Sequence, residues 1–286
     1  MAAIPEGGPP VADEMKSHDV EIEGLRLHYV EAGEGEPVLL LHGWPTSSYL
    51  WRHVMPPMAR HRRVIALDLP GFGKSDKPLE ASYSFRFFEK IMNDFLAELG
   101  IDRLGLAVHD LGGPIGLYWA VRQPQRLQSL ALLNTLLYPE LSWAAKAFVM
   151  AMKVPGLRSL GTSPWALEKT MRLGVAQQKG LTAEIIARVQ EPFRDGAARR
   201  VLAKAGSALS PKGFVDIEQG LEALECPVRV VYGKRDRILP DVAETMARVQ
   251  KDLPQTEITA LSDCGHFLQE DRPDEVGRLL AEFFGA

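Results

Sequence analysis

Short aliphatic runs alternate with longer segments of helical periodicity over most of the chain. Runs of about four to eight apolar residues are typical of buried strands, and the segments between them fit helices packed on a sheet. The pattern predicts an α/β fold with a mostly parallel central sheet, flanked by helices and joined by right-handed crossovers. The expected strands are 37–41, 64–68, 104–108, 127–134, 227–232 and 257–261, and the expected flanking helices are 85–99, 114–124 and 273–284.

The first regular element expected is a hairpin over 19–31. Apolar and polar residues alternate there on either side of Gly24, as in a half-buried strand pair. Residues 1–18 are rich in proline and glycine and predict a flexible lead-in. A basic segment followed by an apolar one is missing from this stretch, so we expect no signal peptide.

Between 135 and 216 the strand pattern stops. Four short segments with helical periodicity replace it, separated by proline and glycine, at 143–153, 163–173, 182–189 and 196–208. We expect a helical cap over 135–216, inserted into an α/β core made of 19–134 and 217–286. Insertion directly after a sheet strand favours a lid over the carboxyl ends of the strands, and an ordinary helical subdomain is the alternative.

Composition narrows the classes of partner. The chain has 286 residues, of which 46% are hydrophobic and 24% charged, and a formal net charge of −4. This globular composition and acidic balance favour neither nucleic acid nor an anionic membrane as partner, and no apolar stretch is long enough to span a bilayer. Two cysteines, Cys226 and Cys264, are too few for a disulfide framework or a zinc site. We therefore expect buried thiols, no metal, and a cytoplasmic monomer or small homo-oligomer.

The stretch 103–117 carries the most informative chemistry. Asp110 lies between an expected buried strand and a helix that Pro114 can begin, and Gly112 and Gly113 permit a sharp turn between them. This order is typical of the nucleophile elbow G-x-S-x-G, with Asp110 in the position of the serine. The alternative for an aspartate here is an N-cap of the following helix.

An aspartate nucleophile implies a different reaction from a serine. Its carboxylate is already ionised at neutral pH and needs no base to activate it. Attack on a saturated carbon that bears a leaving group would form an alkyl ester of Asp110. Water must then hydrolyse this ester, and that step needs a base and an oxyanion site.

A candidate oxyanion site follows the strand at 37–41. His42-Gly43 comes directly after this strand, where an elbow site of this kind keeps half of its oxyanion hole. The backbone N–H groups of Trp44 and Leu111 would be the two donors.

A candidate base and acid follow two later strands. Asp236 comes just after the strand at 227–232, and His266 comes just after the last strand. Parallel sheets place their sites at these strand ends, and the chain order of Asp110, Asp236 and His266 is nucleophile, acid, histidine. The three residues together predict a catalytic triad.

These motifs resemble those of the α/β-hydrolase superfamily, and the resemblance covers the chain nearly end to end. Within that superfamily the chain looks most like the haloalkane dehalogenases, with the epoxide hydrolases next. The segments closest to dehalogenases are HGWPTSSYLWR at 42–52, GFGKSDKP at 71–78 and GHFLQED at 265–271. Val108 also fits dehalogenases better, because epoxide hydrolases usually have glycine there.

The resemblance implies a two-step reaction without a cofactor. It assigns Asp110 as the nucleophile that displaces halide, His266 as the base that activates water, and Asp236 as the acid that orients the histidine. Asn134 lies where some dehalogenases carry their acid instead, which supports Asp236 in that role here. A small apolar organic substrate and water would give an alcohol, halide and a proton.

The leaving-group side departs from the dehalogenase pattern. Dehalogenases typically follow the nucleophile with a tryptophan whose indole N–H binds the halide, and this chain has Leu111, which has no side-chain donor. The indole of Trp44, with Trp143 or Trp165 of the cap, is the expected replacement. Hydrophobic packing is the alternative role for the two cap tryptophans.

Two other functions stay open at this point. The first is an epoxide hydrolase with the same Asp110 nucleophile. Such enzymes protonate the opening ring oxygen with cap tyrosines, and Tyr138 is the only tyrosine between 135 and 216. The second is a catalytically impaired binding protein on this scaffold, against which the complete set of Asp110, Asp236 and His266 argues. Serine esterase activity is disfavoured because no serine occupies the elbow.

Overall fold

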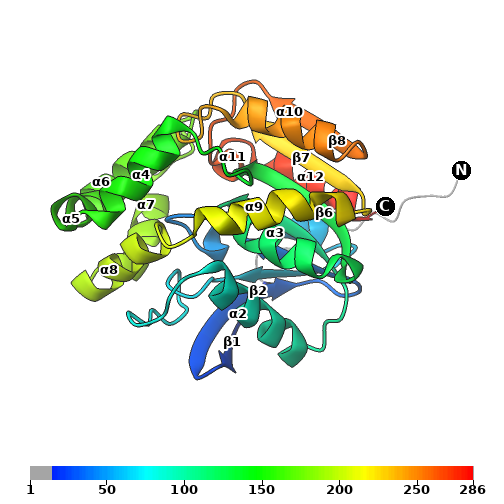
Figure 1. Cartoon of the computed structure of the whole chain (residues 1–286), viewed down its shortest axis with the longest axis horizontal. Helices are drawn as coiled ribbons and strands as arrows, with labels where there is room; N and C mark the ends of the chain where they lie inside the picture. The colour runs from blue at the N-terminus through cyan, green and yellow to red at the C-terminus, as the bar shows by residue number, and fades with distance from the viewer. Residues whose placement is uncertain (1–14, 286) are drawn as a thin grey trace, which may run out of the picture.

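One sheet of eight strands forms the centre of the molecule (Figure 1). The computed structural model describes residues 15–285. The strands are β1 (Lys16–Ile22), β2 (Leu25–Ala32), β3 (Pro37–Leu41), β4 (Arg63–Leu67), β5 (Leu104–Asp110), β6 (Leu127–Thr135), β7 (Val228–Gly233) and β8 (Thr256–Leu261). Their order across the sheet is β1-β2-β4-β3-β5-β6-β7-β8. The β1–β2 and β2–β4 pairs are antiparallel and all others are parallel, which confirms the mostly parallel sheet.

Helices cover both faces of the sheet, so each buried strand contributes to two apolar cores. In β3, Leu39 and Leu41 belong to the core shared with α2 (Phe85–Glu98) and α3 (Gly112–Arg122). Val38 and Leu40 belong to the core shared with α1 (Met55–Met58) and α12 (Pro273–Gly285). Both faces of such a strand are buried, so its consecutive residues are apolar. The sequence therefore shows apolar runs at these strands and no alternation of apolar and polar residues. The flanking helices are α1 (Met55–Met58), α2 (Phe85–Glu98), α3 (Gly112–Arg122), α9 (Pro211–Gly220), α10 (Val242–Asp252), α11 (Leu268–Asp271) and α12 (Pro273–Gly285).

The amino-terminal hairpin is present and starts earlier than expected. β1 pairs with β2 along its whole length, with Lys16 opposite Glu31 and Ile22 opposite Leu25. Residues 16–18, expected in the flexible lead-in, are therefore part of the sheet. Backbone pairing orders them although Lys16 and Ser17 are exposed, so they leave no burial pattern in the sequence. Residues 1–14 of the expected lead-in lie outside the described residues.

A group of helices inserted after β6 lies at the left of Figure 1, beyond the end of the sheet. The four helices expected from periodicity are present, and Pro155 begins a fifth. Proline was expected only to separate helices, but its fixed φ angle also suits the first turn. The helices are α4 (Trp143–Lys153), α5 (Pro155–Gly161), α6 (Pro164–Gly174), α7 (Ala183–Gln190) and α8 (Gly196–Ala205).

Helix α9 packs on the core, against α3. A Cβ at Gly213 would lie 2.0 Å from the Phe85 ring, and one at Gly220 would lie 2.6 Å from Val121. The expected cap boundary at 216 falls in the middle of this helix. We propose that the cap ends before Pro211, because the glycines of α9 fit it closely to the core.

The two cysteines are free, Cys264 being buried and Cys226 partly buried. Burial raises the pKa of both thiols, to about 11 for Cys226 and about 12 for Cys264, so both are protonated at neutral pH. Of the helices in 15–285, none combines the length and the apolar composition that crossing a membrane requires.

Candidate active site

Asp110 lies at a strained turn between β5 and α3. Its φ angle is +49°, in the left-handed region that residues with a side chain rarely adopt. The Thr135 hydroxyl donates to the Asp110 carbonyl oxygen at 2.7 Å and helps to hold this conformation. Strain of this kind is concentrated at functional sites, and it turns the carboxylate out of the strand direction. The elbow expected from the sequence is therefore present.

Three glycines let the backbone approach this turn closely. A Cβ at Gly43 would lie 2.3 Å from the Asp110 side chain, and one at Gly112 would lie 2.6 Å from the backbone carbonyl oxygen of Leu41. At Gly113, a Cβ would lie only 1.7 Å from the Thr135 hydroxyl. Larger residues would push the elbow away from β3 and β6, so these positions need glycine for space.

The fold brings the three expected triad residues together. His266 Nδ1 lies 2.8 Å from Asp236 Oδ2, and His266 Nε2 lies 3.3 Å from Asp110 Oδ2. The histidine is fully buried, and the Asp110 side chain is only 12% exposed. The imidazole therefore bridges two carboxylates, one as an orienting partner and the other as a candidate nucleophile.

Asp236 is fixed by backbone and side-chain donors. Its Oδ1 accepts hydrogen bonds from the backbone N–H groups of Ile238 and Leu239, each at 2.8 Å. Its Oδ2 accepts a hydrogen bond from Asn134 Nδ2 at 2.7 Å, and Asn134 Oδ1 accepts from the Gly233 N–H at 2.9 Å. Sequence reasoning missed this role of Asn134. The signal was a polar residue directly after the apolar run 130–133.

Replacing Asn134 by alanine is expected to reduce turnover about tenfold and stability by roughly 1–3 kcal/mol, because a buried carboxylate and a buried N–H lose a partner. The amide also helps to lower the pKa of Asp236. The acid limb of the pH–rate profile should therefore move to higher pH. Melting temperature and the pH–rate profile are the measurements, and a loss of stability with an unmoved acid limb would contradict the positioning role.

The oxyanion donors expected from the sequence surround the Asp110 carboxylate. The Trp44 backbone N–H donates to Asp110 Oδ1 at 2.7 Å. A hydrogen bond from the Leu111 backbone is among the contacts that lower the pKa of Asp110. His42 anchors the loop, because its Nε2 accepts from the Leu69 N–H at 3.1 Å while its Nδ1 donates to the Gly43 carbonyl oxygen at 3.0 Å. Burial lowers the pKa of His42, so this imidazole is neutral.

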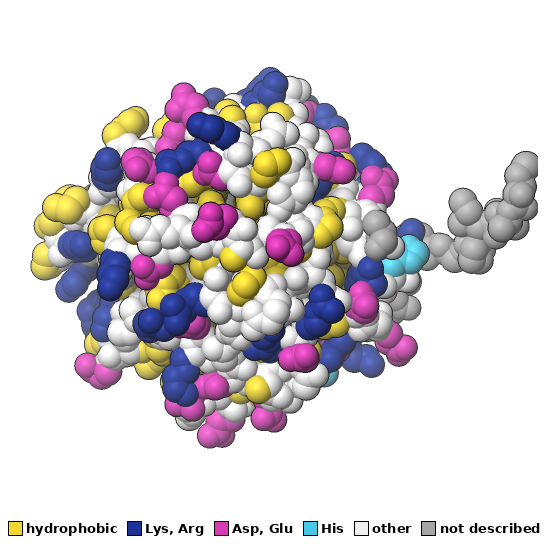
Figure 2. Space-filling view, turned by 45° about the vertical axis from the view of Figure 1, so that its right-hand side comes forward, with side chains coloured by type: hydrophobic (Ala, Val, Ile, Leu, Met, Phe, Trp, Pro, Cys, Tyr) yellow, Lys and Arg dark blue, Asp and Glu magenta, His cyan; other side chains and the backbone are white. Residues whose placement is uncertain are grey.

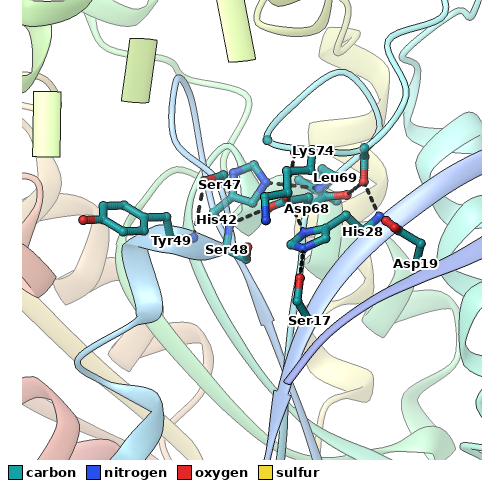
Figure 3. Close-up of polar contacts among 12 residues, drawn as sticks. Ser17, Asp19, His28, His42, Ser47, Ser48, Tyr49, Asp68, Leu69 and Lys74 are labelled. Carbon is teal, nitrogen blue, oxygen red and sulfur yellow. Dashed lines mark hydrogen bonds and ion pairs between the residues drawn. The ribbon is translucent and has the colours of Figure 1, made fainter. Parts of the chain in front are cut away.

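A second buried carboxylate, Asp68, accepts hydrogen bonds that hold the loop after β3 in place (Figure 3). Its oxygens accept hydrogen bonds from the Ser48 N–H at 2.6 Å and the Lys74 N–H at 2.8 Å, and lie 2.8 Å from His28 Nδ1. Burial opposes its charge, but these donors and the neighbouring histidines lower its pKa to about 2. Asp68 thus ties the oxyanion loop to the loop after β4. It was not predicted from the sequence.

The loop that carries His266 is tied to the cap and to the core. Asp271 accepts hydrogen bonds from the Gly265 N–H at 2.7 Å and from the Gln177 N–H at 2.6 Å. Glu270 accepts two hydrogen bonds from Arg52, both at 2.7 Å. The acidic end of the segment 265–271 therefore positions the histidine without touching it.

The three triad residues shift one another's pKa values. Burial disfavours the imidazolium form of His266, but the charges and hydrogen bonds of Asp236 and Asp110 outweigh it and raise its pKa to about 10. For both aspartates, burial disfavours the carboxylate, yet the His266 contacts hold the pKa below its usual value. At neutral pH the free site therefore holds two carboxylates and an imidazolium between them.

Stability should fall between pH 7 and pH 10 because of His266. Its folded pKa lies above the unfolded value, so its contribution is fully present below about pH 6.5 and is lost as the pH rises toward 10. One proton bound only in the folded state lowers the unfolding free energy by about 1.4 kcal/mol for each unit of rising pH in this range. Urea unfolding from pH 7 to 10 measures this slope. The H266Q variant should show a flatter curve, and equal slopes would rule out the raised pKa.

The expected leaving-group donors are not arranged as the sequence predicted. The Trp44 indole N–H donates to the Leu202 carbonyl oxygen of α8 at 3.2 Å, and its ring packs edge-on against Phe148 of α4. Trp143 and Trp165 are 78% and 61% exposed, so water surrounds much of both side chains. The Trp44 indole N–H is therefore already paired in this arrangement, and a donor role for Trp143 or Trp165 stays a prediction. The partners of Trp44 come from distant segments, which a local pattern does not reveal.

Tyr138, the tyrosine considered for epoxide opening, is also occupied. Its hydroxyl donates to Asp252 Oδ2 on α10 at 2.7 Å, and burial together with this carboxylate raises its pKa. Within residues 15–285, His, Cys, Asp and Glu side chains form no group of three or more placed to hold a metal ion.

Known proteins are similar to this chain in sequence and in fold. The alpha/beta hydrolase fold family matches residues 36–273. The haloalkane dehalogenase of Sphingobium indicum is 33% identical over 92% of this chain and 93% of its own length. Haloalkane dehalogenase 2 of Mycobacterium tuberculosis is 30% identical over 91% of this chain and 92% of its own length.

Two solved structures are similar to this chain in fold. The epoxide hydrolase CorEH without ligand has a TM-score of 0.83 at 27% identity, covering 95% of this chain and 99% of that chain. The DbeA-M1 loop variant of the haloalkane dehalogenase from Bradyrhizobium elkanii has a TM-score of 0.82 at 26% identity, covering 94% and 96%. The chain belongs to the α/β-hydrolase family. It is a hydrolase, similar to haloalkane dehalogenases in sequence and to both enzyme types in structure.

Proposed function

We propose that this hydrolase cleaves a carbon–halogen bond through an alkyl ester of Asp110. The carboxylate displaces halide from a small apolar substrate, and the Asp110–carbon bond replaces the carbon–halogen bond. His266, oriented by Asp236, then takes a proton from water, which attacks the ester carbonyl. The N–H groups of Trp44 and Leu111 hold the oxyanion that forms. An alcohol, halide and a proton leave, and Asp110 is restored.

The raised pKa of His266 fits the order of these steps. In the free site the imidazolium pairs with Asp110, whose charge and hydrogen bond are among the causes of that raised pKa. Ester formation removes both, so the pKa of His266 falls and its proton can leave to solvent. The neutral imidazole then becomes the base for the second step, still oriented by Asp236 at 2.8 Å.

The leaving group is the point at which the two enzyme types differ. An epoxide oxygen leaves as an alkoxide and needs an acid, whereas bromide or iodide leaves as the anion of a strong acid and needs none. The Tyr138 hydroxyl, which belongs to the only tyrosine between 135 and 216, donates to Asp252. This single contact favours halide over epoxide. The absence of a side-chain donor at Leu111 favours bromide or iodide over chloride as the leaving group.

Product assays with the purified full-length chain test this proposal. We expect bromide release from short bromoalkanes, no diol from the matching epoxides, and loss of all release in D110N. The asparagine variant keeps the size of the side chain and removes only its nucleophilic charge. Diol formation without halide release would assign the protein to the epoxide hydrolases. Halide release unchanged in D110N would exclude the alkyl-ester mechanism.

Replacing Leu111 by tryptophan is expected to raise kcat/KM for bromoalkanes about tenfold or more, because an indole N–H would stabilise the departing charge. The backbone of Leu111 is helical, with φ −60° and ψ −28°, so its conformation suits any residue with a side chain. The matched control is L111F, which adds an aromatic ring without a donor. An equal gain in L111F would show that ring packing, and not the N–H, causes the effect.

A further inference from the structure

The outer face of α4 is apolar although it faces water. Trp143, Met150 and Val154 are 78%, 62% and 45% exposed, and Ala147 between them is also exposed. Their spacing of four, three and four residues places them on one side of the helix. The inner side is apolar as well, because Phe148 packs against Trp44. A helix with an apolar side against the core normally turns a polar side to water, so the apolar outer side of α4 is an unpartnered face.

The next two helices extend this surface. Leu157 and Leu160 of α5 are 51% and 58% exposed, and Trp165 and Leu173 of α6 are 61% and 48% exposed. We call the exposed apolar side chains of α4, α5 and α6, including Val154 at the end of α4, the cap face. Among the described residues, the cap face holds all the strongly exposed large hydrophobic side chains except Leu79. At the left of Figure 2, over the cap, hydrophobic and basic side chains lie next to one another.

Basic residues surround the cap face. Residues 141–174 contain five Lys and Arg and one Glu, whereas the whole chain has a formal net charge of −4. Lys146, Lys153 and Lys169 are exposed, and Glu168 is paired with Arg172 at 2.8 Å. Lys169 also lies 5.9 Å from the centre of the Trp165 ring. The segment is therefore a local basic region in an acidic protein.

Exposed tryptophans and leucines interspersed with lysines are the features of a surface that enters the headgroup layer of a bilayer without crossing it. Indole rings suit this boundary because they are apolar with one polar N–H. A second copy of this chain is a poorer partner, since a two-fold contact would place the basic regions against each other. We propose that the cap face binds the surface of a membrane that contains anionic phospholipids.

This proposal revises the expectation of no membrane partner. That expectation used the length of apolar stretches and the net charge of the whole chain, and neither quantity describes a local surface. The proposal is independent of the reaction at Asp110, so its test uses binding alone. A failure of one therefore leaves the other intact.

Flotation with vesicles of phosphatidylcholine alone, or of phosphatidylcholine with about 30% phosphatidylglycerol, tests the proposal. We expect the full-length chain to float with the anionic vesicles, and at least tenfold less at 0.5 M salt, about three times the physiological ionic strength. Tryptophan emission should shift to the blue on binding, because Trp143 and Trp165 are exposed while Trp44, Trp51 and Trp119 are buried.

Two variants locate the binding surface. M150Q/L160Q, both at exposed positions, should bind anionic vesicles at least tenfold more weakly. The matched control L79Q changes an exposed leucine outside the cap face and should bind like the unchanged chain. Melting temperatures and light scattering of all three proteins check the fold and the oligomeric state.

Three results would overturn the proposal. No flotation with anionic vesicles would exclude membrane binding, and equal flotation with neutral vesicles would exclude the role of the basic residues. A dimer that M150Q/L160Q abolishes, seen without flotation, would assign the cap face to self-association instead.

Discussion

Replacing His266 by glutamine is expected to limit halide release to one equivalent per active site. Asp110 attacks without help from a base, so the first step continues in H266Q. The second step needs a base at the position of His266 Nε2, 3.3 Å from the nucleophile. Glutamine cannot take that proton, and steady-state turnover should fall about 10³-fold or more.

Rapid-quench halide assays and intact mass spectrometry measure this result. The protein mass should increase by the alkyl group of the substrate, and peptide mapping should place the increase on Asp110. D110N is the control, which should give neither the burst nor the mass increase. Multiple rapid turnovers in H266Q would mean that another group activates water. A mass increase that also forms in D110N would mean that the nucleophile is a different residue.

Replacing Arg52 by methionine is expected to lower the free energy of unfolding by about 3–5 kcal/mol. Glu270 would keep its charge in a place where its side chain is only 4% exposed, without the two hydrogen bonds at 2.7 Å. The loss would also loosen the loop of His266, because Glu270 lies four residues after it. Urea unfolding and turnover of R52M measure the two effects.

The double variant R52M/E270Q distinguishes the effect of losing the Arg52 side chain from the cost of leaving the buried Glu270 carboxylate unpaired. Glutamine at 270 removes the charge while keeping nearly the same shape, so we expect stability to recover by at least about half of the loss. A double variant as unstable as R52M would show that packing of the Arg52 side chain, and not the unpaired carboxylate, causes the effect.

The catalytic candidates could be found in the sequence because each follows a buried strand. Asp110 lies between an aliphatic run and two glycines, and His266 and Asp236 lie after two later runs. In a parallel sheet these strand ends meet at one edge, so chain order and strand position suffice to place the residues together. The structure adds the distances from the His266 imidazole, which are 2.8 Å to Asp236 and 3.3 Å to Asp110.

The partners of the leaving-group candidates could not be found in the same way. Trp44 donates its indole N–H to Leu202, which is 158 residues away, and Tyr138 donates to Asp252. Whether a side-chain N–H or O–H is already hydrogen-bonded depends on such distant residues, and the spacing of residues in the sequence does not show these contacts. Residues that position the triad from outside it, such as Asn134, were missed for the same reason.

The sequence alone thus determined the order of elements, the elbow and the residue type of the candidate nucleophile. These depend on local periodicity, turn residues and the chemistry of single side chains. Only the tertiary structure decided which indoles and phenols are occupied, which carboxylates brace the oxyanion and histidine loops, and which face of α4 meets water. These properties arise from contacts between segments far apart in the chain, and packing against those segments is what the local pattern does not contain.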